Sequence, residues 1–214
     1  MQMPGQPPNP PPWKVRLMKL TTTLFAWMML MGASIPSPEM EMLDAANLRI
    51  ALEKLNVLGS VLSIEAHPDD ENTSVFAYFS LGRKYRTAYL SLTRGDGGQN
   101  LIGPEKGAEI GIIRTQELLA ARRHDGAEQF FSRAIDFGYS KTPEETLDFW
   151  GIEAVLSDLV WVIRTFRPDV IIARSLGEGY AGHGHHAAAG RLTREAFHAA
   201  ADPKRFPEQL NHVK

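Results

Sequence analysis

A short apolar run that is followed at once by a helical pattern constrains this chain more than any other feature. Residues 57–64 are rich in Val, Leu and Ile, as a strand buried on both faces requires, and residues 70–81 have the pattern of a helix. The succession recurs, with strands predicted at 85–92, around Phe130-Phe131 and at 169–173, and helices at 105–123, 143–166 and 185–201. Strands that alternate with helices predict an α/β fold, a Rossmann-like three-layer sandwich with a mostly parallel sheet.

Residues 1–34 are predicted to lie outside this domain. Six of the first 12 residues are Pro, three basic residues follow between positions 14 and 19, and an apolar run at 24–31 ends in Gly32-Ala33-Ser34. This order indicates a Pro-rich extension and a secretory signal peptide, with Met18 as an alternative start. The run is too short for a membrane span. We therefore expect an exported protein, periplasmic or extracellular, with an uncleaved membrane anchor as the alternative.

The remaining residues, 41–214, are predicted to form one domain that begins with a helix at 41–55. The formal net charge of −2 gives no electrostatic case for nucleic acid binding. The chain has no Cys, which excludes disulfides, thiolate zinc sites and cysteine nucleophiles, so His and carboxylates must hold any metal. Four strands are few for this architecture, and we expect the sequence to be partial at its C-terminus.

The first group of chemically active side chains follows the strand at 57–64. His67 comes directly after it in the sequence Ala66-His67-Pro68-Asp69-Asp70-Glu71, and the acids open the next helix. His67 and Asp70 are three residues apart across a strand-to-helix turn, so both can face one point, and both are suitable zinc ligands. Acidic residues also stabilise a helix N-terminus, but that role does not account for a His with three consecutive acids.

The second group follows the strand at 169–173. His183, His185 and His186 lie at the start of the last predicted helix, where His183 and His186, three apart, can share a face. Taken alone, the group is equally compatible with a His-rich surface turn. However, both groups fall at predicted C-terminal strand ends, which is where α/β sheets place their sites.

Together the two groups predict one zinc ion per chain with an open position for water, the pattern of a catalytic site. A carboxylate that does not bind the metal can then act as general base. Asp69 is the candidate if Asp70 binds the metal. His183, as an imidazolium, is the candidate for stabilising the oxyanion.

At these residues the sequence resembles the LmbE-like, or PIG-L, family of zinc-dependent de-N-acetylases, from about residue 56 to 210. The resemblance implies that His67, Asp70 and His186 bind zinc, that Asp69 is the general base and that His183 is the second catalytic residue. It also implies a substrate such as a small N-acetylated sugar, of N-acetylglucosamine type, or a glycoconjugate. One departure is His185, which stands where many members carry Asp.

Two further motifs resemble the family. Arg94 and Asp96 lie in a Gly-rich loop, and Arg114 begins an Arg-x-x-Glu helix motif, so all three are candidate substrate-binding residues. A solvated turn and a surface ion pair are the plainer interpretations. Trp150 and Trp161 are predicted to be core residues.

Three alternatives to sugar deacetylation stay open. The first is a zinc amidase that acts on a non-sugar amide, because the motifs do not distinguish acyl groups or leaving amines. The second is a non-catalytic sugar- or metal-binding homologue. A magnesium-dependent phosphotransfer enzyme is the third, although His ligands suit zinc better than magnesium.

Overall fold

The computed structural model describes residues 44–175 and 182–213. The predicted extension and signal peptide lie outside these residues and stay predictions. In chain order the elements are α2 (Ala45–Lys54), β1 (Ser60–Glu65), α3 (Thr73–Phe76), η1 (Ala77–Gly82), β2 (Arg86–Ser91), α4 (Ala108–Asp125), β3 (Glu128–Phe131), α5 (Pro143–Trp150), α6 (Ile152–Phe166), β4 (Val170–Ile172), α7 (Gly184–Ala201) and η2 (Pro207–Asn211).

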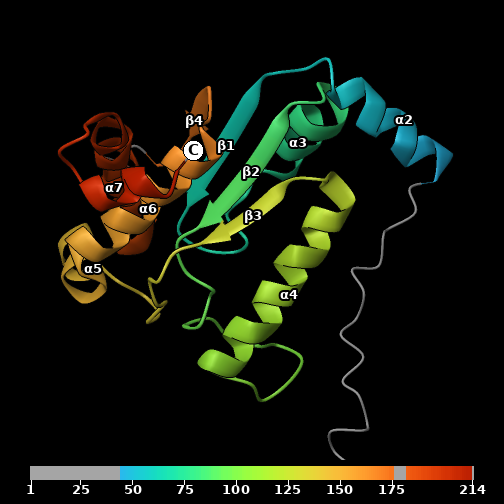
Figure 1. Cartoon of the computed structure of the whole chain (residues 1–214). Helices are drawn as coiled ribbons and strands as arrows, with labels where there is room; N and C mark the ends of the chain where they lie inside the picture. The colour runs from blue at the N-terminus through green and yellow to red at the C-terminus, as the bar shows by residue number, and fades with distance from the viewer. Residues whose placement is uncertain (1–43, 176–181, 214) are drawn as a thin grey trace, which may run out of the picture. The chain divides into compact units, whose positions relative to one another are not determined.

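The four strands form one parallel sheet in the order β3-β2-β1-β4. β1 is central and pairs with β2 over six residues and with β4 over three. In the chain, β2 precedes α6 and β4 follows it. The parallel direction brings the C-terminal ends of β1, β2 and β3 to one edge, as Figure 1 shows. The predicted α/β class is therefore confirmed.

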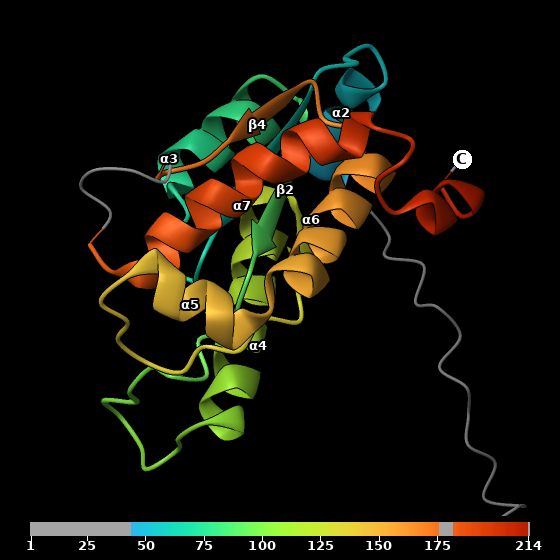
Figure 2. The same cartoon turned by 90° about the vertical axis from the view of Figure 1, so that its left-hand side faces the viewer.

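Helices cover both faces of the sheet. Leu62 and Ile64 of β1 face a core built with α5, α6 and α7, whose buried members include Leu156 and Leu192. Tyr89 of β2 faces the opposite way and packs with Phe76 and Leu118 beneath α3 and α4. Figures 1 and 2 show these two layers of helices with the sheet between them. The alternation of side chains along a strand thus produces the predicted three layers.

The predicted helix at 143–166 is wrong in one respect, because two helices occupy it. α5 ends at Gly151, whose φ of 76° lies in the left-handed region, and α6 begins directly after it. Glycine adopts this conformation without the steric cost that a Cβ imposes. Of the two Trp residues predicted to be core residues, Trp150 is buried, whereas Trp161 on α6 is 39% exposed.

The predicted helix at 70–81 begins later, at Thr73. Asn72 precedes it and its side chain accepts hydrogen bonds from the backbone N–H groups of Ser74 and Val75, which is the contact that starts the helix. Residues 66–72 therefore form a turn between β1 and α3, and three of them, His67, Asp69 and Asp70, line a cavity at the strand-end edge of the sheet. Within the described residues, no helix combines the length and the apolar character that crossing a bilayer needs.

Candidate active site

The turn after β1 holds His67 and Asp70 in a fixed relation. The backbone N–H of His67 donates to Asp70 Oδ2 at 2.9 Å, and Asp70 N donates to the carbonyl oxygen of His67 at 3.3 Å. Buried Tyr89, from β2, adds a hydrogen bond from its hydroxyl to the same His67 carbonyl at 2.5 Å. The turn is thus closed on itself and tied to the neighbouring strand.

The start of α7 supplies the second set of imidazoles. His183 is the N-cap residue, and its Nδ1 accepts from the backbone N–H of His185 at 3.4 Å. Gly184 N donates to the carbonyl of Ser140 at 2.8 Å, and a Cβ at Gly184 would lie only 2.2 Å from the Thr142 carbonyl oxygen. This close packing fixes the N-terminal turn of α7 against the segment before α5, with its histidines directed at the turn after β1.

His67, Asp70 and His186 meet at one point. Asp70 Oδ2 lies 3.1 Å from His67 Nδ1, and Asp70 Oδ1 lies 3.2 Å from His186 Nε2. Two ligands about 2.0–2.1 Å from a tetrahedral zinc ion are about 3.3 Å apart, so this donor set fits zinc. Burial alone would raise the pKa of Asp70, but hydrogen bonds with His186 and His67 outweigh it and hold that pKa below its ordinary value.

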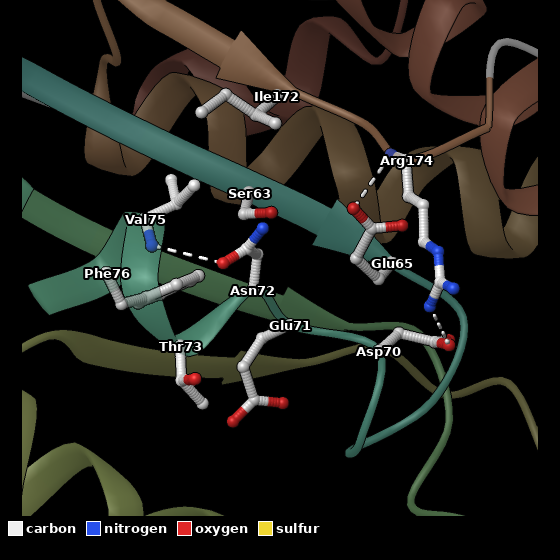
Figure 3. A pocket seen from close by; sticks show the side chains of 10 residues that line it. All are labelled: Ser63, Glu65, Asp70, Glu71, Asn72, Thr73, Val75, Phe76, Ile172 and Arg174. Atoms are coloured by element: carbon white, nitrogen blue, oxygen red, sulfur yellow. Dashed lines mark hydrogen bonds and ion pairs between the residues drawn. The ribbon is translucent and has the colours of Figure 1, made fainter. Parts of the chain in front are cut away.

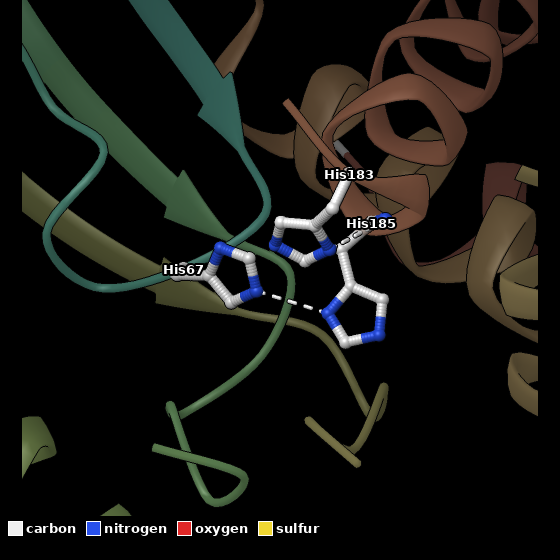
Figure 4. Close-up of side chains that lie close together, drawn as sticks. All are labelled: His67, His183 and His185. Atoms are coloured by element: carbon white, nitrogen blue, oxygen red, sulfur yellow. Dashed lines mark hydrogen bonds between the residues drawn. The ribbon is translucent and has the colours of Figure 1, made fainter. Parts of the chain in front are cut away.

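A second group of possible metal ligands shares His67. Among the described residues, the ligand atoms of His67, His183 and His185 also lie within 4.8 Å of one another. Figure 4 shows these three rings at the N-terminus of α7 and the end of β1. The group consists of imidazoles alone, whereas the first group includes a carboxylate.

A cavity of about 350 Å³ opens beside the predicted ligands. Its lining includes Asp69, Arg114, Asp136, Tyr139, His183 and His186. The side chain of Asp69 is 67% exposed, and its Oδ2 lies 3.5 Å from Arg114 Nη2. Asp69 thus lines the cavity without belonging to the ligand group, and its role as general base stays a prediction.

The other predicted substrate-binding residues lie in different surroundings. Arg94 donates to Thr115 Oγ1 at 3.1 Å and its guanidinium lies 4.1 Å above the ring of Phe131. Asp96 packs against Gly111 of α4, where a Cβ would meet Asp96 Oδ1 at 2.3 Å. Neither residue lines the cavity, and their roles in substrate binding stay predictions.

The Gly-rich loop has a clear effect on Arg114. Gly95 has a φ of 73°, and a Cβ there would lie 2.7 Å from Cδ of Arg114. The missing side chain lets the arginine pass over the loop toward Asp69. The loop is therefore a support for Arg114, the one predicted substrate-binding residue that lines the cavity.

A larger cavity, of about 510 Å³, lies on the other side of Asp70. Figure 3 shows Glu65 and Arg174 at its edge, where the backbone N–H of Arg174 donates to Glu65 Oε1 at 2.8 Å. Burial raises the pKa of Glu65 to about 8, despite the opposing effect of that hydrogen bond. Asp70 also meets Arg174 Nη1 at 3.6 Å, so the predicted ligand lies between the two cavities.

Glu71, the last residue of the first motif, faces away from the cavity of the predicted ligands. It forms an ion pair with Arg122 of α4 at 3.2 Å, and both side chains are almost fully buried, 7% and 5% exposed. Arg122 also pairs with Asp125 at 2.6 Å and lies over the ring of Phe76. This buried network attaches the turn after β1 to α4.

Sequence reasoning missed Asp136 and Tyr139, which lie after β3. Asp136 is buried and its oxygens lie 3.7 Å from His185 Nδ1 and 4.0 Å from His67 Nε2. The segment 132–142 has no helical or strand periodicity. Its place after the predicted strand at Phe130-Phe131 was the available signal, since strand ends host the sites of such sheets.

The surroundings of His183 and His185, at the start of α7, shift the pKa values of both rings. Burial lowers the pKa of His183, and the nearby His186 and His67 lower it further. Burial and the adjacent His67 lower the pKa of His185 to about 4. These shifts favour the neutral form of both rings in the metal-free protein, and the role of His183 as an imidazolium during catalysis stays a prediction.

Comparisons with known proteins agree with this arrangement. The model of the PIG-L family, described as GlcNAc-PI de-N-acetylase, matches residues 62–197. A 1D-myo-inositol 2-acetamido-2-deoxy-alpha-D-glucopyranoside deacetylase from Geodermatophilus obscurus is 30% identical over 69% of this chain and 56% of its own length. A mycothiol S-conjugate amidase from Streptomyces coelicolor is 28% identical over 69% of this chain and 55% of its own. The chain thus spans about half the length of these relatives.

Solved structures share the fold at low sequence identity. An N,N'-diacetylchitobiose deacetylase from Pyrococcus horikoshii has a TM-score of 0.57 and 21% identity, over 80% of this chain and 66% of that one. A 4-carboxy-2-hydroxymuconate hydratase from Pseudomonas putida has a TM-score of 0.54 and 22% identity, over 69% of this chain and 59% of that one. The family match covers more than half of the sequence and includes both His groups, and the chain therefore belongs to the PIG-L family.

Proposed function

We propose that this protein is a zinc-dependent hydrolase that removes the N-acetyl group from an N-acetylglucosamine-type sugar or glycoconjugate. The observation that carries the proposal is the meeting of His67, Asp70 and His186 beside a cavity that Asp69 also lines. These three residues would hold one zinc ion per chain. Three protein ligands are the number that holds a catalytic zinc ion.

When bound, zinc supplies Lewis-acid chemistry, because it polarises a carbonyl and makes water more acidic. Asp69 removes a proton from the attacking water, whose oxygen forms a bond to the acetyl carbon. The carbon–nitrogen bond then breaks, and Asp69 returns the proton to the leaving nitrogen. The products are acetate and a free amine.

In this scheme His183 stabilises the negative charge of the oxyanion, and Arg114 orients the carboxylate of Asp69. Because Nδ1 of His183 accepts a backbone hydrogen bond, its Nε2 carries the hydrogen and donates it to the developing oxyanion. Arg114 lies 3.5 Å from Asp69 and orients that carboxylate in the cavity. Arg94 and Asp96 belong to the proposal only as contacts of the more distant part of the substrate.

The relatives support a GlcNAc-type substrate, since one deacetylates a glucosamine-inositol conjugate and a structural neighbour is named a chitobiose deacetylase. One relative is named a mycothiol S-conjugate amidase, and it makes hydrolysis of another amide, such as that of a thiol conjugate, the second candidate. Both candidates use the same residues. Only the group that carries the amide differs.

The test is acetate release by the zinc-loaded protein from N-acetylglucosamine, N,N'-diacetylchitobiose and an N-acetylglucosaminyl-inositol, beside a thiol-conjugate amide. We expect Asp69→Asn to lower kcat/KM by about 10²–10⁴-fold while zinc stays bound. Asp70→Ala should lose both zinc and activity. Asp148→Asn, an exposed acid on α5, is the matched control and should change neither.

Unaltered turnover in Asp69→Asn or Asp70→Ala would contradict the mechanism. Hydrolysis of the thiol-conjugate amide alone would favour the second candidate. Stoichiometric zinc without hydrolysis of any amide would favour a binding protein instead.

We also propose that the protein is exported through the signal peptide predicted in residues 1–34. The proposal rests on the basic residues, the short apolar run and the small residues that follow. N-terminal sequencing of the expressed protein after cell fractionation tests it. A cytoplasmic protein that retains residues 1–34 would contradict it.

A further inference from the structure

We propose that His185 is a positioning residue that orients His67 toward the metal, and not a metal ligand itself. The inference rests on the proposed function, because it requires His67 to bind zinc. His185 stands where many members of the family carry Asp. Its side chain is fully buried, at 0% exposure. Its role here is therefore read from its own contacts.

The two ring nitrogens of His67 face different partners. Nδ1 lies 3.1 Å from Asp70 Oδ2, on the side of the predicted zinc ligands. Nε2 lies 2.9 Å from Nδ1 of His185, 118 residues later in the chain. A ring held at both nitrogens cannot rotate about its Cβ–Cγ bond without losing a contact, so His185 fixes the direction of the Nδ1 lone pair.

The hydrogen positions follow from this geometry. An imidazole that binds a metal through Nδ1 carries its hydrogen on Nε2. The His67 Nε2–H then donates to His185 Nδ1, which must be unprotonated, and His185 keeps its own hydrogen on Nε2. That Nε2 is buried and has no hydrogen-bond partner among the described residues.

The surroundings of His185 hold its ring in place. The ring of Phe137 lies 4.6 Å away edge to face, and that of Trp150 lies 5.0 Å away. Trp150 is itself fixed, since its Nε1–H donates to the Ile135 carbonyl at 2.9 Å. A ring packed on two sides by aromatic groups is a rigid acceptor for His67.

Asp136 completes the arrangement. One of its oxygens lies 3.7 Å from His185 Nδ1 and accepts a hydrogen bond from Gly138 N at 2.9 Å, while the other lies 4.0 Å from His67 Nε2. The carboxylate is thus beside the His67–His185 contact. A negative charge at this place favours an N–H at the contact, and metal binding through His67 Nδ1 would put that hydrogen on His67 Nε2.

The competing role is that of a ligand in the group His67, His183 and His185. Two nitrogens that share a tetrahedral zinc ion lie about 3.3 Å apart, whereas 2.9 Å is an ordinary N–H···N hydrogen-bond distance. The His67–His185 distance therefore favours a hydrogen bond over a shared metal.

The experiment compares zinc affinity, measured by chelator competition, in the wild type, His185→Phe and His185→Asn. Phe retains the aromatic volume but has no acceptor, and we expect zinc affinity to fall about 10–100-fold. The Oδ1 of Asn stands as many bonds from the backbone as His Nδ1, so this variant should keep zinc affinity within a few-fold of wild type. His198→Phe, an exposed residue of the same helix, is the control and should be unchanged.

A second measurement needs no substitution. The ¹⁵N chemical shifts of the zinc-loaded wild type should show His185 protonated at Nε2 only. Protonation at Nδ1, unchanged zinc affinity in His185→Phe, or a second equivalent of zinc that disappears in His185→Phe would overturn the inference. A wild type that binds no zinc would overturn the proposed function as well, so the two failures are distinguishable.

Discussion

Two buried acids near the end of β1, Asp70 and Glu65, have pKa values that are shifted in opposite directions. Hydrogen bonds with His186 and His67 hold the pKa of Asp70 below its ordinary value against the effect of burial. Glu65 lines a cavity together with Asp70, but there burial outweighs the hydrogen bond from Arg174 N and the nearby His186, and it raises the pKa of Glu65 to about 8. The ligand is ionised and the neighbouring acid is neutral near pH 7, so negative charge is concentrated on the oxygens that face the predicted metal.

The raised pKa of Glu65 predicts how the free energy of unfolding changes with pH. In the unfolded chain this carboxyl ionises near pH 4.5, whereas in the folded protein it stays neutral until about pH 8. The native state therefore binds more protons between these values, and the free energy of unfolding falls as pH rises through this window. Over this pH window the free energy of unfolding falls by on the order of a few kcal/mol.

Replacing Glu65 by Gln removes this titration and keeps an oxygen that can accept from Arg174 N. We expect Glu65→Gln to stabilise the metal-free protein by about 1–3 kcal/mol at pH 9 and by much less at pH 5. Urea denaturation at the two pH values measures the difference. An equal effect at both would show that Glu65 is ionised in the folded protein.

The sequence predicts the residues of the two His groups because each lies between a strand and a helix, and the structure brings His67, Asp70 and His186 together. Asp136 and Tyr139 were not predicted, since their segment reaches the cavity only through its packing against α7 and the Gly-rich loop. His185 was identified as a departure from the family pattern. Its contact with His67 depends on the direction of α7, which no local pattern indicates.

At the scale of elements, the buried pair Glu71–Arg122 connects the turn after β1 with α4. Two nitrogens of Arg122 and one oxygen of Glu71 have no hydrogen-bond partner among the described residues. The pair therefore stabilises the fold only while both charges are present. Removing one leaves the other buried without a counter-charge, which costs about 3–5 kcal/mol.

We accordingly expect Arg122→Met to lower the free energy of unfolding by about 3–5 kcal/mol, because Glu71 and Asp125 lose their partner. Arg123→Met, on the exposed side of the same turn of α4, is the matched control and should change it by less than about 0.5 kcal/mol. Thermal or urea denaturation checks both. A similar loss in the two variants would show that helix propensity, and not the buried pair, determines the effect.

Element boundaries were less predictable than element types. The periodicity of 143–166 continues through Gly151, so the sequence indicated one helix, while the positive φ at that glycine ends α5 and changes the direction of the chain. The sequence pattern also predicts a helix from residue 70, which includes part of the turn at 66–72. Its own backbone and side-chain hydrogen bonds, including those of Asp70 and Asn72, delay the helix to Thr73.

For the molecule as a whole, the predicted zinc ligands join two layers of the sandwich. His67 and Asp70 follow the central strand, and His186 belongs to α7 on one face of the sheet. Metal that binds only when these parts are assembled stabilises the folded state by mass action. At a free zinc concentration of 100 times Kd this amounts to about 2.7 kcal/mol.

We therefore expect zinc to raise the Tm of the chelator-treated protein by roughly 5–10 °C under these conditions. Differential scanning calorimetry with and without zinc measures the shift. Asp70→Ala should show no shift, and magnesium should have none on the wild type. A zinc-dependent shift that persists in Asp70→Ala would place the metal elsewhere.

The three-layer architecture was predictable as a whole because each strand and helix carries its own pattern and parallel sheets follow from their alternation. The strand order β3-β2-β1-β4, in contrast, has no signature in any local pattern of the sequence. It depends on where the crossover through α6 places β4, which here lies beside β1 on the side away from β2.

The place of β1 in that order has a consequence for folding. The contact of His67 with His185 closes a loop of 118 residues, and such closure costs more chain entropy than the local turns that join β1 to β2. A chain whose β4 and α7 have not yet docked presents only His67 and Asp70 and lacks the third ligand. If zinc binds as proposed, its occupancy distinguishes molecules that have joined β1 to α7 from those that are merely collapsed.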